Sequence, residues 1–269
     1  MLSILYAVAL LGGLGMLFGV LLSYADKKFH VEVDERQLKI REAITGANCG
    51  VCGYPGCDAF AEAVFEGKAP IDGCVPGGQK ALNAIAAIMG KTAEQREPMI
   101  ARVLCQGSAG MAKTRYVYTG IPSCRLAASM AGGPLKCNVA CIGLGDCVQA
   151  CQFDAIHIVN GLAVIDDDKC TACGACVTAC PHDVIRVLPK AADVIIRCRN
   201  VDRAREARDA CSVACIGCKR CEKACQHGAI HVDNMHAAID PATCTLCGDC
   251  VAACPTGSIT MTPSGCLSA

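Results

Sequence analysis

An unbroken apolar run opens the chain. Residues 2–24 carry no charged side chain, and the first charges after them are Asp26, Lys27 and Lys28. As a helix rising about 1.5 Å per residue, this run spans roughly 34 Å, enough to cross a hydrocarbon core of about 30 Å. A cleaved signal peptide would instead need a basic residue before a shorter apolar core. Because the lysines follow the run, the positive-inside rule predicts an anchor over residues 1–26, with the N-terminus outside and the remainder in the cytoplasm.

Beyond the anchor, short helical and strand-like patterns alternate. Residues 34–44 and 79–89 have helical patterns, the first with Asp34 as N-cap and the second ended by Gly90. Short strand patterns occur at 102–105, at 116–118 and, with clear alternation, at 155–159, and a helical run follows Cys124. These patterns predict an α+β protein built from small units.

Cysteine changes this picture more than any other residue type. The chain has 25 cysteines, and the spacing C-x2-C-x2-C-x3-C begins at Cys170, at Cys215 and at Cys244. This spacing is the bacterial ferredoxin signature, in which three thiolates bind one [4Fe–4S] cluster and the fourth binds the neighbouring cluster. The pattern therefore predicts one-electron transfer chemistry.

The cysteine pattern also belongs to a longer repeat. From Cys137 onward the chain repeats itself with an offset of 74 residues, so that Cys141 corresponds to Cys215 and Cys180 to Cys254. Each copy is expected to form an α+β ferredoxin-like module with two clusters. The domains expected after the anchor are a mainly helical unit, a connector, module 1, a linker and module 2, over residues 32–90, 91–136, 137–190, 191–210 and 211–263.

Two other uses of cysteine explain these runs less well. Disulfide frameworks belong to small secreted domains and do not explain triplets spaced two residues apart. Zinc sites usually combine two C-x2-C pairs that lie a dozen or more residues apart. The ferredoxin-type runs therefore favour iron–sulfur clusters, which also fit a reducing, cytosolic environment.

A separate group of four cysteines lies in the unit over residues 32–90. Its spacing is C-x2-C-x4-C-x16-C, with glycine beside each of the first three, and its members are Cys49, Cys52, Cys57 and Cys74. Glycines allow close approach of the backbone, whose N–H groups can bond to cluster sulfurs and tune the potential. Spacing alone leaves a zinc site open here as an alternative to a [4Fe–4S] cluster.

The repeat contains one departure. Leu144 stands where the second copy has Cys218, so the first half of module 1 lacks one thiolate. Cys137, just upstream of Cys141, is predicted to replace it, whereas its repeat mate Cys211 has no vacant iron to serve. The cysteines left unassigned are expected to be buried structural thiols, with a sixth cluster left open; they are Cys105, Cys124, Cys198, Cys211 and Cys266.

The cross-over rule then predicts five [4Fe–4S] clusters. We call the four cysteines predicted to bind one cluster a group. Group N lies in the helical unit, and groups 1 to 4 follow it in chain order. Group N comprises Cys49, Cys52, Cys57 and Cys74; group 1 comprises Cys137, Cys141, Cys147 and Cys180; group 2 comprises Cys151, Cys170, Cys173 and Cys176; group 3 comprises Cys215, Cys218, Cys221 and Cys254; and group 4 comprises Cys225, Cys244, Cys247 and Cys250.

Several function classes are disfavoured. The formal net charge is zero, so no basic surface suggests nucleic acid as a partner. Neither a dinucleotide-binding nor a P-loop glycine motif is present, and no nucleophile–base pair stands out. His157, His182, His227 and His231 lie near the cysteines and are expected to be surface or supporting groups. No catalytic residue is predicted.

A membrane anchor, an N-C-G-x-C-G-Y-P-G-C segment and ferredoxin modules occur together in this order. In this arrangement the chain resembles the B subunit of the Rnf electron-transport complex over essentially its whole length. The most specific segments are Asn48–Cys57 with Cys74, the glycine pair Gly77-Gly78, and Cys141–Cys147. Two modules instead of one resemble the longer form found in anaerobes.

The resemblance implies a subunit of a ferredoxin:NAD oxidoreductase complex coupled to Na⁺ or H⁺ translocation. Its partners would be other membrane and flavin-bearing subunits, and reduced ferredoxin would be the electron donor. Alternatives are an electron-transfer subunit of another membrane reductase or hydrogenase, a reducer of a redox-sensing transcription factor, or a zinc-loaded scaffold.

Overall fold

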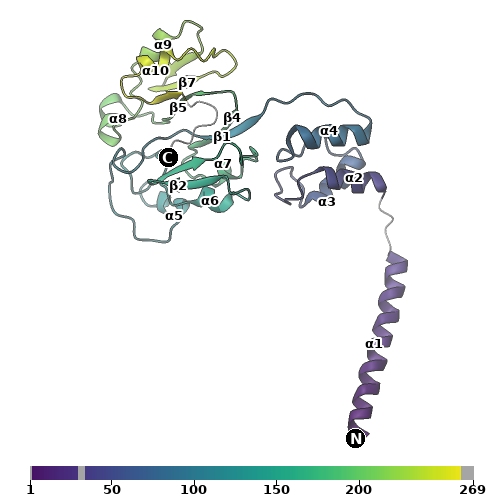
Figure 1. The fold of residues 1–269 in the computed structure, drawn as a ribbon. Coiled ribbons are helices and arrows are strands. Elements are labelled where there is room, and N and C mark those ends of the chain that lie inside the picture. The colour runs from purple at the N-terminus through teal and green to yellow at the C-terminus, as the bar shows by residue number, and fades with distance from the viewer. Residues whose placement is uncertain (1, 30–33, 262–269) are drawn as a thin grey trace.

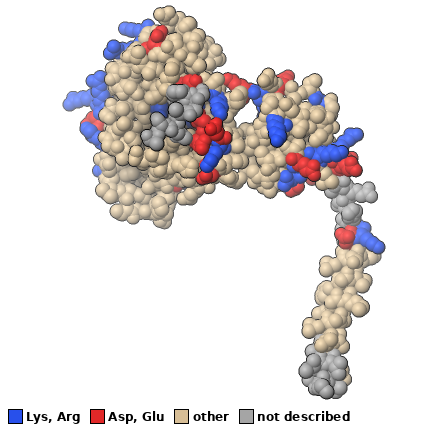
Figure 2. Space-filling view, in the orientation of Figure 1, with Lys and Arg blue, Asp and Glu red and all other residues tan. Residues whose placement is uncertain are grey.

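The computed structural model describes residues 2–29 and 34–261. The apolar run forms helix α1 (Leu2–Phe29), and the stretch Val8–Lys28 is the one candidate membrane span among the described residues, with a mean hydropathy of 2.0. Figure 2 shows charged side chains on this helix only at its C-terminal end, where Lys27 and Lys28 lie. The helix has the length and composition that the sequence predicted for an anchor.

The second unit is helical, as expected. Its helices are α2 (Glu35–Ala43), α3 (Cys57–Phe65) and α4 (Gly78–Met89), which Figure 1 shows packed together. The Asp34 side chain accepts a hydrogen bond of 2.7 Å from the Arg36 amide, which confirms the predicted N-cap. Ile40, Phe60 and Ile85 are fully buried between the helices and form the apolar core of the unit.

Module 1 consists of two antiparallel strand pairs and three short helices. Strand β2 pairs with β3 as a hairpin, and β1 pairs with β4, so the chain returns to the strand on which the module begins. The elements are β1 (Met99–Val103), α5 (Cys124–Ser129), α6 (Asp146–Ala150), β2 (Ile156–Val159), β3 (Leu162–Ile165), α7 (Ala175–Ala179) and β4 (Ile185–Pro189).

Module 2 repeats this plan, with α8 at the place in the chain order that α5 has in module 1. The hairpin is now β6 with β7, and β5 pairs with β8. The elements are β5 (Val194–Ile196), α8 (Ala204–Ala210), α9 (Arg220–Ala224), β6 (Ile230–Asp233), β7 (His236–Ile239), α10 (Asp249–Ala253) and β8 (Ile259–Met261).

The strand pairing extends both modules upstream of their expected boundaries. Strand β1 lies in the expected connector and β5 in the expected linker, yet each forms half of a module sheet. The strand expected at 116–118 is absent from this described segment. There the hydroxyl of Tyr116 donates a hydrogen bond to the Met130 carbonyl. The amides of Arg115 and Tyr116 both donate to the Pro134 carbonyl, and this pattern does not form a strand ladder.

The two modules are in direct contact. Ala112 forms a β-bridge with Cys211, the Lys113 amide donates to the Ala210 carbonyl at 2.9 Å, and the Ser212 amide donates to Met111 at 3.1 Å. Outside this bridge, Asp209 forms ion pairs with Lys113 and with a second lysine, Lys136. The segment before Cys124 therefore connects module 1 to module 2 through backbone hydrogen bonds.

Candidate metal centres

All 24 described cysteines are free thiols. Among the described residues, no group of three or more His, Cys, Asp or Glu side chains is placed to hold a single metal ion. A tetrahedral zinc site would need its sulfurs converging on one point. A cubane cluster has its irons at the corners of a cube, so its thiolates are spread around a cavity, and several such cavities are present.

The cysteines that the cross-over rule assigns to group 3 line one cavity, and those it assigns to group 4 line another. The cysteines of group 3 line a cavity of about 310 Å³, together with Pro255 and Ile259. Those of group 4 line a cavity of about 300 Å³, with His227 at its wall. In both cavities the chain brings one distant thiol, Cys254 or Cys225, to a local triplet.

The four cysteines of group 2 also lie near one another in module 1. Burial and, to a smaller extent, the nearby thiols of Cys170, Cys173 and Cys151 together raise the pKa of Cys176 to about 12. Cluster assembly must remove such protons, because the thiolate is the ligand.

Group N lies at the edge of the helical unit. Cys57 belongs to its apolar core, with Cys52 and Cys74 packed against it. The Asn48 side chain accepts a hydrogen bond of 2.8 Å from the Cys57 amide, which holds the cysteine loop against the start of α3. A Cβ atom on Gly77 would lie 3.0 Å from the Cys74 sulfur, so this glycine leaves room for the thiol.

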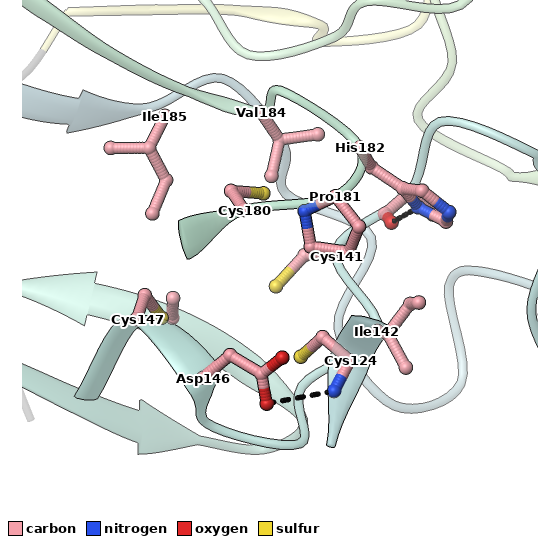
Figure 3. Close-up of a pocket in the computed structure, with 12 residues that line it drawn as sticks. Cys124, Cys141, Ile142, Asp146, Cys147, Cys180, Pro181, His182, Val184 and Ile185 are labelled. Carbon is pink, nitrogen blue, oxygen red and sulfur yellow. Dashed lines mark hydrogen bonds between the residues drawn. The ribbon is translucent and has the colours of Figure 1, made fainter. Parts of the chain in front are cut away.

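Group 1 differs from the sequence-based prediction. A cavity of about 320 Å³ is lined by Cys141, Cys147, Cys180 and, as the fourth thiol, Cys124. Figure 3 shows these four sulfurs around one space. Cys137 does not line it. The sequence reasoning missed Cys124 because it lies between Cys105 and Cys137, in a segment 19 residues longer than the corresponding segment between Cys198 and Cys211.

Asp146 positions Cys124 at this cavity. Its carboxylate accepts hydrogen bonds from the amides of Cys124 and Arg125, at 2.9 and 3.0 Å, and from the Ser123 hydroxyl at 3.0 Å. Burial raises the pKa of Asp146, but these hydrogen bonds outweigh it and lower the pKa below its usual value. The carboxylate thus caps α5 and fixes the residue that begins it.

The loop with the missing thiolate keeps the geometry of its repeat. Gly143 and Gly217 both have positive φ, and a Cβ on either would meet the backbone of the following hairpin turn within 3.0 Å. Gly145 and Lys219 are also both left-handed. Leu144 therefore occupies the same place in the loop as Cys218, and the thiol at the cavity comes from elsewhere in the chain.

The histidines do not replace cysteines at these cavities. His182 lines the group 1 cavity, but its Nδ1 atom lies 2.6 Å from the Ala140 carbonyl oxygen and is bonded to it. The ring therefore supports the wall of the cavity.

Hydroxyl groups distinguish group 3 from group 1. Burial raises the pKa of Cys254, but hydrogen bonds from Ser258 and Thr256 outweigh it and lower the pKa to about 7. The Ser258 oxygen lies 3.3 Å from the Cys254 sulfur. In module 1 the corresponding residue, by the 74-residue offset, is Val184, which has no hydroxyl.

Replacing Ser258 by valine should lower the reduction potential of the group 3 cluster. A hydrogen bond to a ligand sulfur stabilises the more negative, reduced cluster, so its loss favours oxidation. The reverse change, Val184→Ser, should raise the potential of the group 1 cluster. Redox titration followed by EPR measures both, and an unchanged potential in Ser258→Val would contradict this role of the hydroxyl.

Comparisons with known proteins agree with these features. Residues 46–76 match the family described as "Putative Fe-S cluster", residues 163–186 a 4Fe-4S binding domain, and residues 214–258 a 4Fe-4S dicluster domain. Fold and cysteine groups together define an iron–sulfur protein of the ferredoxin class with an apolar N-terminal helix.

The relatives narrow this class to one family. The B subunit of an ion-translocating oxidoreductase complex from Methanosarcina acetivorans is 41% identical over 94% of this chain and 96% of its own. The B subunit of the Na⁺-translocating ferredoxin:NAD⁺ oxidoreductase complex of Acetobacterium woodii is 44% identical over 96% and 78%. Its counterpart in the proton-translocating complex of Clostridium ljungdahlii is 38% identical over 94% and 90%. The chain belongs to this family of B subunits, the Rnf family.

Proposed function

We propose that this chain is the multi-cluster electron-transfer subunit of a membrane complex that oxidises ferredoxin, reduces NAD⁺ and translocates ions. The observation that carries the proposal is the gathering of cysteines into groups of four around cavities of about 300 to 320 Å³. Relatives named as subunits of ferredoxin:NAD⁺ oxidoreductase complexes support the same reaction.

Five [4Fe–4S] clusters are proposed for groups N and 1 to 4. In group 1, Cys124 replaces Cys137 as a ligand, beside Cys141, Cys147 and Cys180. When bound, each cluster accepts and donates a single electron. The protein supplies the thiols, of which only those of Cys218 and Cys247 are exposed among the proposed ligands, and the backbone turns that bring distant cysteines to each local group.

Partner subunits must supply the rest of the reaction. Reduced ferredoxin is the proposed donor, and flavin-bearing and multi-span membrane subunits are the proposed acceptors. The described residues offer one candidate membrane span, and a single helix cannot enclose an ion pathway. Ion translocation is therefore assigned to the partners, and the chain passes electrons to them.

Membranes containing the complex test this function. Removing this chain should abolish ferredoxin-dependent reduction of NAD⁺, while NADH oxidation by an artificial acceptor at a flavin-bearing partner continues. The purified full chain should also oxidise reduced ferredoxin under anaerobic conditions, with the appearance of [4Fe–4S] EPR signals. A chain that dithionite reduces but ferredoxin does not would contradict the proposed donor.

The orientation of the anchor is a second proposal. Lys27 and Lys28 lie in the last turn of α1, and by the positive-inside rule this supports cluster domains on the cytoplasmic side. A fluorescent protein that matures only in the cytoplasm should be bright when fused after Ala269, and alkaline phosphatase at the same place should be inactive. The opposite pair of results would reverse the topology.

A further inference from the structure

Four described cysteines remain outside the five groups, and they line one cavity. Cys105, Cys137, Cys198 and Cys211 surround a space of about 350 Å³, similar to the cavities of groups 1, 3 and 4. A Cβ atom on Gly107 would lie 3.6 Å from the sulfurs of both Cys105 and Cys211. These two sulfurs, from opposite modules, therefore lie no farther apart than twice that distance.

The cavity lies where the two modules meet, and each module contributes equivalent residues. Cys137 and Cys211 are repeat mates at the 74-residue offset. Cys105 and Cys198 each lie two residues beyond the end of the strand that opens a module, β1 or β5. Neither pair has a place in the ferredoxin pattern, but the docking of the modules brings the two pairs together.

Hydrogen-bond donors are directed at the sulfurs. The Cys105 sulfur accepts from the amides of Gly107 and Cys141, at 3.4 and 3.5 Å, and the Cys198 sulfur accepts from the Cys215 amide at 3.2 Å. Donors stabilise thiolates, the form that binds metal.

A side chain completes this set of donors. The amide of Asn200, a residue that is 1% exposed, lies 3.6 Å from the Cys137 sulfur. A buried amide aimed at a sulfur is costly to leave without a partner, so the wall of the cavity is built for an acceptor.

Positive charge lines the same cavity. Arg197 and Arg199 both belong to its wall. The Arg197 guanidinium donates to the Cys105 carbonyl at 3.3 Å, whereas the Arg199 guanidinium is paired with the Asp183 carboxylate. A guanidinium close to four thiolates offsets their negative charge, as buried charges need partners. Buried thiols with a purely structural role would require neither the Arg197 guanidinium nor the sulfur-directed amides.

We propose that Cys105, Cys137, Cys198 and Cys211 bind a sixth [4Fe–4S] cluster between the modules. Four thiols line one cavity here, as they do at groups 1, 3 and 4, and the cavity volumes are similar. The cluster takes one electron from a reduced cluster of one module and gives it to an oxidised cluster of the other.

Its neighbours make this role specific. Cys105 is hydrogen-bonded to the amide of Cys141, a ligand in group 1, and Cys198 to the amide of Cys215, a ligand in group 3. The sixth site therefore adjoins one proposed cluster in each module. This inference rests on the proposed electron-transfer function and adds the connection between the modules.

Iron analysis of the full chain, purified in detergent and reconstituted anaerobically, tests the site. The wild type should bind about 24 iron atoms, since each cubane holds four. Cys105→Ser with Cys198→Ser should bind about 20 and lose one EPR signal, and Cys137→Ser with Cys211→Ser should lose the same signal. Cys266→Ser, the matched control for a cysteine in none of the groups, should retain about 24.

The other outcomes separate the two proposals. A wild type with about 20 iron atoms, unchanged in both double variants, would overturn the sixth cluster and leave the five-cluster function standing. One zinc per chain, lost in both double variants, would also overturn it. A loss of a whole module of clusters in both would mean that the thiols only hold the modules together, whereas a wild type well below 20 would count against the proposed function itself.

Discussion

Replacing Cys124 by serine is expected to remove the group 1 cluster or convert it to a three-iron form. Cys124 lines the cavity of Cys141, Cys147 and Cys180, and its backbone is held there by Asp146. With Leu144 in the loop, no local thiol can take its place. Iron content and the EPR spectrum of the reduced and oxidised full chain measure the loss, which should spare the signals of the other groups.

A second substitution makes this result specific. Cys124→Ser combined with Leu144→Cys should restore the cluster, because the loop around Leu144 has the backbone geometry of the loop around Cys218. Cys137→Ser combined with Leu144→Cys should restore nothing, since Cys137 lines the other cavity. A Cys124→Ser chain that keeps all its iron and an unchanged spectrum would return the assignment to Cys137.

Arg102→Met is expected to destabilise module 1 by about 3 kcal/mol. Arg102 lies on β1 and donates from Nη1 to the Asp167 carboxylate at 2.5 Å, with side-chain exposures of 10% and 19%. Removing one partner leaves a mostly buried charge without compensation, which costs about 3–5 kcal/mol in buried pairs. The residual exposure of Asp167 places the effect at the lower end. The urea midpoint for loss of cluster absorbance measures it.

Two controls accompany this substitution. Lys39→Met removes an ion pair with Glu35 in which both side chains are well exposed, and should change the free energy of unfolding by less than about 1 kcal/mol. Arg102→Met combined with Asp167→Leu should recover much of the loss, because no charge is then buried alone. Equal midpoints for Arg102→Met and Lys39→Met would show that the pair contributes little.

Local sequence was sufficient wherever the chemistry is local. The length and composition of the apolar run predicted α1. Asp34 predicted the start of α2, because its side chain can accept a hydrogen bond from the first turn of the helix. The cysteine triplets at Cys170, Cys215 and Cys244 predicted their groups in the same way, because ligands a few residues apart reach one cluster through a single turn of chain.

The departures arise where the decisive contacts are long-range. Strand β1 was assigned to a connector because its partner, β4, lies more than eighty residues away. Cys137 was assigned to group 1 because it is the nearest upstream thiol, whereas Cys124 reaches that cavity through the cap that Asp146 forms. The sequence does contain one sign of this difference. Module 1 has Asp146, which holds Cys124 in place, where module 2, which retains Cys218, has Arg220.

The sequence by itself therefore determined the class of protein, its membrane helix, its repeat and most of its cysteine groups, since each depends on the order of nearby residues. Only the tertiary structure shows that Cys124 lines the cavity of Cys141, Cys147 and Cys180, and that Cys105, Cys137, Cys198 and Cys211 line another. Those cysteines come from two modules, which contact each other through α8 and the 107–113 segment and through hydrogen bonds such as that of Arg197 to Cys105. Spacing along the chain carries no information about such a contact, because it is fixed by burial and backbone pairing between distant segments.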